Sequence, residues 1–344
     1  MLYRKSNREF KLIIIDNKFL NSTYLPFTKI RTLNYIIYLK RLISFFKKEN
    51  RSIELVICGE PWLTYWIAKL SSKLGKKKFP IQIQFHGDFG SRNWRTASIK
   101  NWLKYCFLFI KDRQVVSLRF VSELQYQNLK HKVADWQRLC VIPVPLAFEN
   151  IPIRKRKSNL GVNFKLLMVG RVEIERGLNV LTKLLLRLDN YGLGFKLIIA
   201  GQGSKINWLK QWTSSNTPNL QLEIEGFIDG KKINKIFSKA DLTLNLATSE
   251  SYGRAARESL VAGTPVLATK SSGMVTLHSQ VKGNGITFLP SKVDEISNIH
   301  KIISNSAKKV VSHKTKLKLV DESESNYEAI VDDWIRTVSE IHVH

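Results

Sequence analysis

Glu250 and Glu258 are separated by seven residues and enclose a small-aromatic-glycine turn, Ser251-Tyr252-Gly253. A glycine in such a turn lets the backbone approach a ligand closely, and it can open a helix whose first N–H groups are unpaired. These N–H groups bind an anion, while a carboxylate on either side accepts hydrogen bonds from hydroxyl groups. The stretch therefore favours a ligand with hydroxyls at both ends and an anion between them, such as a sugar joined through a diphosphate to a ribose. Taken alone, the two glutamates would also fit a solvated helix face.

Two arginines follow another strand-like segment. The apolar residues 164–169 end at Gly170-Arg171, and Arg176-Gly177 stands just before an amphipathic stretch. Two guanidinium groups beside a helix N-terminus suit a diphosphate, because each can donate charge-assisted hydrogen bonds to phosphate oxygens. The spacing predicts that both arginines hold the anion, and the alternative is a pair of solvated arginines in a loop.

The whole segment Ala247–Thr269 resembles the signature of the retaining nucleotide-sugar glycosyltransferases of family 4, which have the GT-B fold. In that signature, a glutamate, seven residues and a second glutamate precede a Gly-x-Pro-Val strand, which stands here as Gly263-Thr264-Pro265-Val266. The Gly-Arg and Arg-Gly pairs at 170–171 and 176–177 match the same family. The resemblance extends over roughly residues 53–300.

The resemblance implies a role for each candidate residue. Glu250 would hold sugar hydroxyls and face the positive charge that develops on the sugar, whereas Glu258 would hold the ribose hydroxyls. Arg171, Arg176 and the backbone amides near Ser251–Gly253 would hold the diphosphate. The resemblance also assigns a donor-site glycine, a nucleobase pocket and a sugar pocket: Gly170, Phe227 with Ile228, and His86. A lone histidine after a strand can equally be structural.

Apolar runs rich in Ile and Leu alternate with amphipathic stretches along the 344 residues. This alternation predicts an α/β protein with parallel sheets, and the length suggests two domains. Together with the resemblance, it leads us to expect a GT-B fold, in which two Rossmann-like doubly wound domains face a central cleft. Residues 1–150 would bind the acceptor, residues 151–320 the nucleotide sugar, and a helix over 321–344 would cross back to the first domain. The segment 149–159 is the predicted linker, and Phe10–Asp16 is predicted as a buried parallel strand.

The net charge of the chain is +27, and residues 1–150 carry 27 Lys and Arg against 10 Asp and Glu. Such an excess implies an anionic partner, either a lipid surface or a nucleic acid. Residues 98–111 combine aromatic side chains with lysines, which suits an anionic membrane interface, although a core helix with solvated lysines is the alternative. A second basic helix is predicted over residues 28–48.

Cys58, Cys106 and Cys140 lie far apart without metal-type spacing, and no apolar run reaches 18 residues. We therefore expect buried, reduced thiols, no zinc site, and neither secretion nor a membrane span. The expected location is the cytoplasm, with the protein lying peripherally on the inner face of the membrane.

These features predict a retaining hexosyltransferase that moves a sugar from a nucleotide-diphosphate donor to a glycan or lipid-linked acceptor in surface polysaccharide biosynthesis, such as that of lipopolysaccharide. We expect no cofactor, no metal and no nucleic acid partner, since arginines can carry the charge of the diphosphate. Two alternatives stay open. A non-catalytic GT-B partner subunit would fit the absence of the family's Gly-Gly loop before Phe10. A basic nucleic-acid-binding protein would fit the charge, although no compact recognition motif is present.

Overall fold

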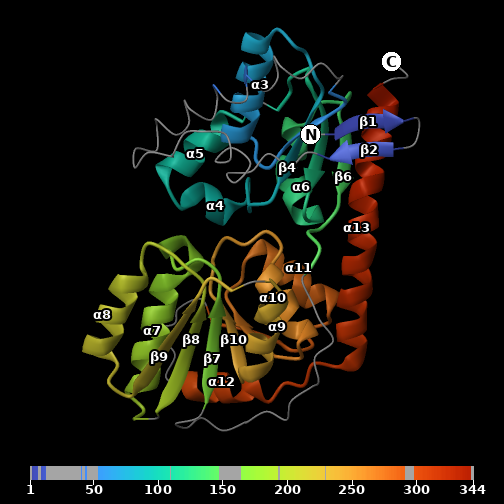
Figure 1. The fold of residues 1–344 in the computed structure, drawn as a ribbon. Helices are drawn as coiled ribbons and strands as arrows, with labels where there is room; N and C mark the ends of the chain where they lie inside the picture. The colour runs from blue at the N-terminus through green and yellow to red at the C-terminus, as the bar shows by residue number, and fades with distance from the viewer. Residues whose placement is uncertain are drawn as a thin grey trace. The chain divides into compact units, whose positions relative to one another are not determined.

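The computed structural model of the chain describes residues 2–6, 9–12, 40, 43–44, 53–108, 110–146, 164–192, 194–228, 230–290 and 298–341. These residues form two compact units (Figure 1). The first unit contains the described residues up to Gly90, then Arg95–Ile142, and those from Glu328 onward. The second unit contains Ser91–Trp94 and the described residues from Pro143 to Tyr327. Each unit has its own parallel sheet flanked by helices, so the predicted α/β class is confirmed.

Six parallel strands form the sheet of the second unit, in the order β12-β11-β10-β7-β8-β9 (Figure 1). Their bounds are β7 (Lys165–Val169), β8 (Phe195–Ala200), β9 (Leu220–Gly226), β10 (Leu242–Asn245), β11 (Val266–Ala268) and β12 (Ile286–Phe288). Read from β9, the third, second and first strands of the unit are followed by the fourth, fifth and sixth. This is the strand order of a Rossmann fold.

Both faces of this sheet are buried. Leu166 and Met168 of β7 join one apolar cluster, and Leu167 between them joins a second cluster. A parallel strand that is covered on both faces needs a continuous apolar run, which explains the sequence of β7. Side chains of α7, α8 and α12 complete the first cluster and those of α9 and α10 the second. The helices of the unit are the 3-10 turn η2 (Ile174–Arg176), α7 (Leu178–Asp189), α8 (Ile206–Asn216), α9 (Gly230–Lys239), α10 (Arg254–Val261), α11 (Ser272–Gln280) and α12 (Ile299–Ala307).

The sheet of the first unit has four described parallel strands in the order β3-β4-β5-β6. They are β3 (Val56–Cys58), β4 (Ile81–Phe85), β5 (Val115–Phe120) and β6 (Arg138–Val141). The helices are α3 (Leu63–Gly75), α4 (Arg92–Thr96), which begins in the second unit, α5 (Ile99–Cys106), α6 (Glu123–Leu129) and the 3-10 turn η1 (Lys130–Lys132). Phe85 and Phe120 stack at 4.8 Å between ring centroids in the core of this sheet.

The prediction of a parallel strand over Phe10–Asp16 is wrong for the part that the structure describes. Strand β2 (Glu9–Leu12) pairs antiparallel with β1 (Leu2–Ser6) in a separate two-stranded sheet. Two strands that are only two residues apart in the sequence can pair only in the antiparallel sense, because a parallel pair needs a crossover of a dozen residues or more. Of the helix predicted over 28–48, only residues 40 and 43–44 are described, and they are helical. The predicted linker 149–159 lies outside the described residues.

Helix α5 is not a core helix. It covers less of the predicted segment 98–111 than expected, and none of its side chains is buried. Trp102 is 53% exposed, and Phe107, which directly follows the helix, is 57% exposed. The expectation of three buried thiols is consequently wrong for Cys106, at the end of α5, which is exposed, and Cys140 is only partly buried, whereas Cys58 is buried.

The last helix, α13 (His313–Ile341), begins earlier than the sequence predicts and contributes residues to both units. Its end packs against the first unit through a buried polar network. The Asp333 carboxylate accepts hydrogen bonds from Gln82 Nε2 at 2.9 Å and from Arg138 Nε at 3.2 Å. Trp334 Nε1 donates to Gln82 Oε1 at 3.1 Å. Within the described part of the chain, neither α13 nor any other helix combines the length and the apolarity that a bilayer crossing requires.

The hydrogen bonds around Asp333 explain how the sheet can hold a buried polar side chain, Gln82, in one of its middle strands. Gln82 lies in β4 and is fully buried, and a buried amide without partners destabilises the folded state. Ser117 Oγ accepts a second hydrogen bond from Gln82 Nε2 at 3.0 Å. The end of α13 is thus the partner that a polar residue in the central strand needs.

We expect Asp333→Ala to lower the free energy of unfolding by about 2 to 3 kcal/mol, because Gln82 and Arg138 would lose a buried acceptor. Urea denaturation followed by tryptophan fluorescence measures the loss. The matched control is Asp332→Ala, which removes the neighbouring exposed carboxylate and should stay within about 0.5 kcal/mol of the parent. Equal stabilities of the two variants would contradict the role given to the network.

Candidate functional site at the switch point of the second sheet

The order of strands in the second unit reverses between β7 and β10, which are neighbours in the sheet. In open parallel sheets, ligands bind beyond the carboxyl ends of the strands at such a switch point. The loop after β7 carries Gly170, Arg171 and Arg176, and the loop after β10 carries Glu250. The structure therefore brings these predicted residues, which are up to 80 positions apart in the chain, to one edge of one sheet.

Glycines hold the loops at this edge in close contact. Gly177 has φ +86°, and a Cβ atom there would lie 2.0 Å from the carbonyl oxygen of Leu246, at the end of β10. A Cβ atom on Gly201, after β8, would lie 1.9 Å from the carbonyl oxygen of Gly170. The Gly-x-Gly at 201–203 reads from the sequence as a tight turn that lines a pocket. In the structure, neither of its glycines has a positive φ, and both are needed because other backbone atoms approach them.

An ion pair joins the two loops at the switch point. Arg176 donates from Nη1 to Glu250 Oε2 at 2.8 Å, and the two side chains are 36% and 18% exposed. The sequence assigns Arg176 to a phosphate and Glu250 to a sugar. The structure places the two residues against each other, so both groups are within reach of one ligand.

Arg171 lies on the same loop but points to solvent. Its side chain is 65% exposed, and its guanidinium is 3.6 Å from Glu175 within the loop. Glu173, between them, accepts hydrogen bonds from Ser204 N at 2.6 Å and from Ser204 Oγ at 2.7 Å. These hydrogen bonds hold the pKa of Glu173 below its usual range and tie the loop after β7 to the loop after β8.

Helix α10 begins directly after the turn at Gly253, which has φ +75°. The N–H groups in the first turn of a helix have no intrahelical acceptor, and no described side chain caps those of α10. Glu258, in the middle of α10, is almost fully buried, and its Oε1 lies 3.1 Å from Arg254 Nε. Arg254 is not among the residues predicted for the site, although an arginine four residues before a glutamate is a recognisable helical pair.

Tyr252 and Ser251 point away from solvent. Both are buried, and the ring of Tyr252 lies 4.0 Å from the guanidinium carbon of Arg257. Arg257 is itself buried, donates from Nε to the Tyr252 carbonyl at 3.1 Å, and donates from Nη1 to Gln280 Oε1 at 2.7 Å. Of Tyr252, only the backbone is therefore placed to contact a ligand, while its side chain and Arg257 hold the turn in position.

The first turn of α11, the helix that follows β11, supports the turn at residues 251–253. The N–H group of Gly273 donates to the carbonyl of Glu250 at 2.6 Å, and a Cβ atom on Gly273 would lie 2.5 Å from the nitrogen of Tyr252. The sequence predicts a loop at Gly273, which is wrong, because the residue lies in the first turn of α11. Its contact with Glu250, more than 20 positions earlier in the chain, depends on the fold, and no local sequence pattern predicts it.

The residues predicted for the nucleobase pocket lie further from the switch point. Phe227 follows β9 and is 77% exposed, whereas Ile228 is partly buried and packs on the sheet cluster that contains Leu167. Both follow β9, an edge strand of the sheet, whereas Arg176 and Glu250 follow the two strands at the switch point.

His86 belongs to the first unit and directly follows β4. Its Nε2 lies 3.0 Å from Gln84 Oε1. Although the ring reaches solvent, desolvation by the surrounding protein and the nearby Arg119 guanidinium lower the pKa of His86 to about 4. The imidazole is therefore neutral at pH 7, and its role in sugar binding stays a prediction.

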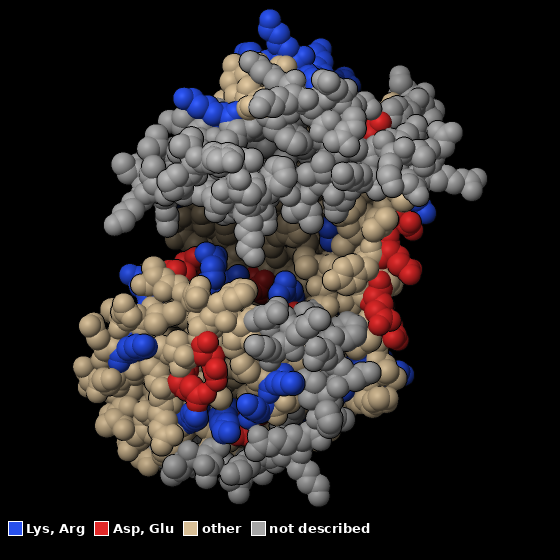
Figure 2. Space-filling model, viewed as in Figure 1, with Lys and Arg blue, Asp and Glu red and all other residues tan. Residues whose placement is uncertain are grey.

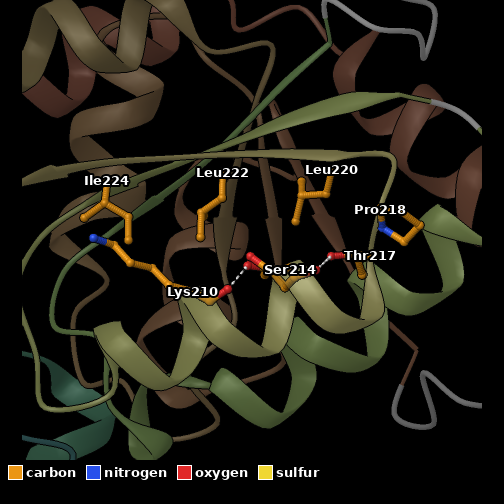
Figure 3. A pocket seen from close by; sticks show the side chains of 8 residues that line it. Lys210, Ser214, Thr217, Pro218, Leu220, Leu222 and Ile224 are labelled. Atoms are coloured by element: carbon orange, nitrogen blue, oxygen red, sulfur yellow. Dashed lines mark hydrogen bonds between the residues drawn. The ribbon is translucent and has the colours of Figure 1, made fainter.

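A cavity of about 590 Å³ lies between α8 and the edge strand β9 (Figure 3). Leu220, Leu222 and Ile224 line one side, and polar residues of α8 such as Lys210 and Ser214 line the other. None of the sequence-predicted site residues lines this cavity. Among the described residues, no group of three or more His, Cys, Asp and Glu side chains is placed to hold a metal ion.

Solved structures identify the fold as GT-B. Sucrose-phosphate synthase from Thermosynechococcus elongatus superposes with a TM-score of 0.66 and 16% sequence identity, over 93% of this chain and 81% of that chain. HepE of Anabaena, solved in complex with UDP and glucose, superposes with a TM-score of 0.62 and 16% identity, over 90% of this chain and 83% of that chain. At this level of identity, the similarity shows the fold alone.

Residues 151–317 match the model of the family described as glycosyl transferases group 1. An uncharacterized glycosyltransferase of Methanocaldococcus jannaschii is 27% identical over 160 residues, which are 43% of this chain and 40% of the relative. A GDP-mannose-dependent alpha-(1-6)-phosphatidylinositol dimannoside mannosyltransferase of Mycobacterium tuberculosis is 28% identical over 109 residues, which are 31% of this chain and 28% of the relative. The matches thus cover less than half of either relative.

The contact at Gly177 allows a test of the close approach between the loops. We expect Gly177→Ala to lower the free energy of unfolding by about 3 kcal/mol, because the new Cβ atom combines an unfavourable φ with an overlap on the Leu246 carbonyl. The control is Gly192→Ala, where φ is +66° but no atom lies within 4 Å of the added Cβ, and which should cost about 1 kcal/mol. Denaturation of both variants in urea measures the difference, and equal losses would show that φ alone matters.

Proposed function

We propose that the chain is a retaining glycosyltransferase that transfers a sugar from a nucleotide-diphosphate donor to a glycan or lipid-linked acceptor in surface polysaccharide biosynthesis. The observation that carries this proposal is the Arg176–Glu250 pair at the switch point of a Rossmann-type sheet, next to the uncapped N-terminus of α10. A cation, a carboxylate and free N–H groups meet there, which is the set of groups that a sugar diphosphate requires.

The reaction places opposite charges on the two halves of the donor. The leaving diphosphate gains negative charge while the sugar becomes electron-deficient, and preorganised groups aimed at these charges lower the barrier. Arg171, Arg176 and the first amides of α10 would stabilise the diphosphate, so that donor binding needs no divalent metal and no cofactor. Glu250 would bind sugar hydroxyls and face the electron-deficient carbon, and Glu258 would bind the ribose.

The name of one similar protein and the bound ligands of another support this assignment. The mannosyltransferase of Mycobacterium tuberculosis uses a GDP-linked sugar and a phosphatidylinositol-based acceptor, and HepE holds UDP and glucose. For this chain, we accordingly propose a nucleotide-sugar donor, and we favour a lipid-linked acceptor over a soluble one.

Removal of Arg176 tests the site. We expect Arg176→Ala to lower kcat/KM about 10²- to 10³-fold, as the loss of one charge-stabilising donor typically does. The measurement is release of the nucleoside diphosphate from UDP-glucose or GDP-mannose in the presence of membrane-derived acceptors. Arg336→Ala, which removes an exposed arginine of α13, is the matched control and should retain parental turnover. Parental turnover by Arg176→Ala would refute the assignment.

A lipid-linked acceptor requires access to a membrane, and the first unit offers a suitable surface. Around α5, the exposed large apolar side chains are Ile99, Trp102, Leu103 and Phe107. Figure 2 shows basic side chains gathered at the top of the first unit, over α3. Exposed lysines on α3 and directly after it are Lys73, Lys76 and Lys78. Exposed apolar side chains and exposed lysines on the same unit suit an interface with anionic lipid, so we propose peripheral binding to the cytoplasmic leaflet.

Vesicle sedimentation checks this proposal. We expect the chain to bind vesicles with anionic lipid more tightly than neutral vesicles, and high salt should weaken binding because exposed charges are screened. The double variant Trp102→Ser/Phe107→Ser should bind at least about tenfold more weakly, since each aromatic side chain would contribute about 1 kcal/mol on leaving water. The control Trp208→Ser/Tyr327→Ser removes two exposed aromatic side chains of the second unit and should bind like the parent. Indifference to lipid charge and salt would return nucleic acid to consideration.

A further inference from the structure

A second cavity, of about 630 Å³, lies wholly within the first unit and away from the switch point of the second sheet. It is bounded by α3, by the segment before β5 and by η1. Four of the eight side chains that line it are basic: Lys69, Lys111, His131 and Lys132. The proposed transfer reaction does not use any of them.

The one acidic side chain of the cavity already has its partners. Asp112 accepts hydrogen bonds from Tyr65 Oη at 2.7 Å, from Gln114 N at 2.9 Å and from Lys69 Nζ. Burial alone would raise the pKa of Asp112, but these hydrogen bonds hold it below its usual range. Asp112 is therefore an anion that neutralises Lys69, and it does not compensate the other lysines.

Lys111 and Lys132 form no ion pair with a carboxylate among the described residues. Lys132 lies instead over the ring of Tyr105, with Nζ 4.6 Å from the ring centroid, and the guanidinium of Arg95 lies 4.9 Å from the same ring. The Arg95 Nε atom is buried and has no hydrogen-bond partner in the described part of the chain. Cations that gather without carboxylates create a positive potential that attracts an anion.

The pKa of His131 depends on this positive potential. Its Nε2 lies 2.9 Å from Tyr105 Oη, which ties it to the same cluster. Desolvation lowers the pKa of His131, and repulsion by Lys132, Arg95 and Lys111 lowers it further. An anion bound among these groups would oppose that repulsion and raise the pKa of the histidine.

We propose that this cavity binds a phosphate-bearing ligand, with the phosphate between Lys111 and Lys132 and the remainder of the ligand against the partly exposed ring of Trp66. Three features select this class of ligand. The lining provides ammonium groups, which bind phosphate as point charges. The volume exceeds that of a bare phosphate ion and fits a small headgroup. Trp66 is 45% exposed and offers an apolar wall. The source of the phosphate is either a lipid headgroup or a soluble phosphate compound.

The test uses inorganic pyrophosphate, with the side-chain NMR signal of His131 as a local readout that does not depend on the donor site. We expect saturating pyrophosphate to raise the pKa of His131 by about 1 in the parent, as a neighbouring opposite charge does. In Lys111→Gln/Lys132→Gln the ligand-free pKa should already be higher, because two cations are gone, and pyrophosphate should no longer change it. The control Lys301→Gln/Lys308→Gln removes the same charge from exposed lysines of the second unit and should respond like the parent.

A second arm identifies the source. Sedimentation with vesicles of equal parts phosphatidylglycerol and phosphatidylcholine should lose more bound protein for Lys111→Gln/Lys132→Gln than for the control if the ligand is a lipid headgroup. An equal loss for the two variants, with the NMR response intact, would identify a soluble phosphate compound. The proposal is overturned if pyrophosphate leaves the pKa of His131 in the parent unchanged. It is also overturned if pyrophosphate raises this pKa equally in Lys111→Gln/Lys132→Gln. Nucleotide binding by the cavity variant should stay at the parental level, so failure of this proposal is separate from failure of the transferase assignment.

Discussion

The candidate site depends on backbone contacts that only glycine permits. At Gly177, Gly201 and Gly273, a Cβ atom would lie between 1.9 and 2.5 Å from the backbone of another loop. These contacts bring together the loops that follow β7, β8 and β10 and the start of α11, so close backbone contacts hold the segments that carry the site side chains. The 2.8 Å distance between Arg176 and Glu250 follows from this arrangement. A site that stabilises a transition state benefits from such rigid support, because its groups need no reorganisation during the reaction.

Because Arg176 is paired with Glu250, the two opposite charges of this pair cancel before the donor binds. Each charge is partly removed from water, and mutual attraction offsets part of the desolvation cost. Under the proposed function, a diphosphate offers Arg176 more negative charge than one carboxylate does. Arg176 would then bind the phosphate, and Glu250 would become available to hydroxyl groups of the sugar. The same pair thereby couples binding of the anion to positioning of the sugar.

Local patterns in the sequence predicted the elements well where the chemistry is local. A helix after Gly253 was expected from the turn itself, and α10 begins at Arg254. The predictions were incomplete where a side chain has a distant partner. Gln82 is readable as a strand residue, but its partner Asp333 lies some 250 positions away. Arg257 and Gly273 likewise acquire their roles only when α10 and α11 meet. The error at Phe10–Asp16 has the opposite cause, since a nearby strand in the sequence competed with the sheet for pairing.

The two units differ more in the pairing of their cations with carboxylates than in their folds. In the second unit, the cations of the candidate donor loops have carboxylate partners: Arg171 with Glu175, Arg176 with Glu250, and Arg254 with Glu258. In the first unit, Lys111, Lys132 and Arg95 have aromatic or solvent neighbours and no described carboxylate partner. A donor site therefore does not account for the excess of positive charge, because its own charges are balanced. Unbalanced cations repel one another and destabilise a folded unit unless an anion compensates them. Under the two proposals for the first unit, phosphate groups at a lipid surface and in the cavity would compensate this excess.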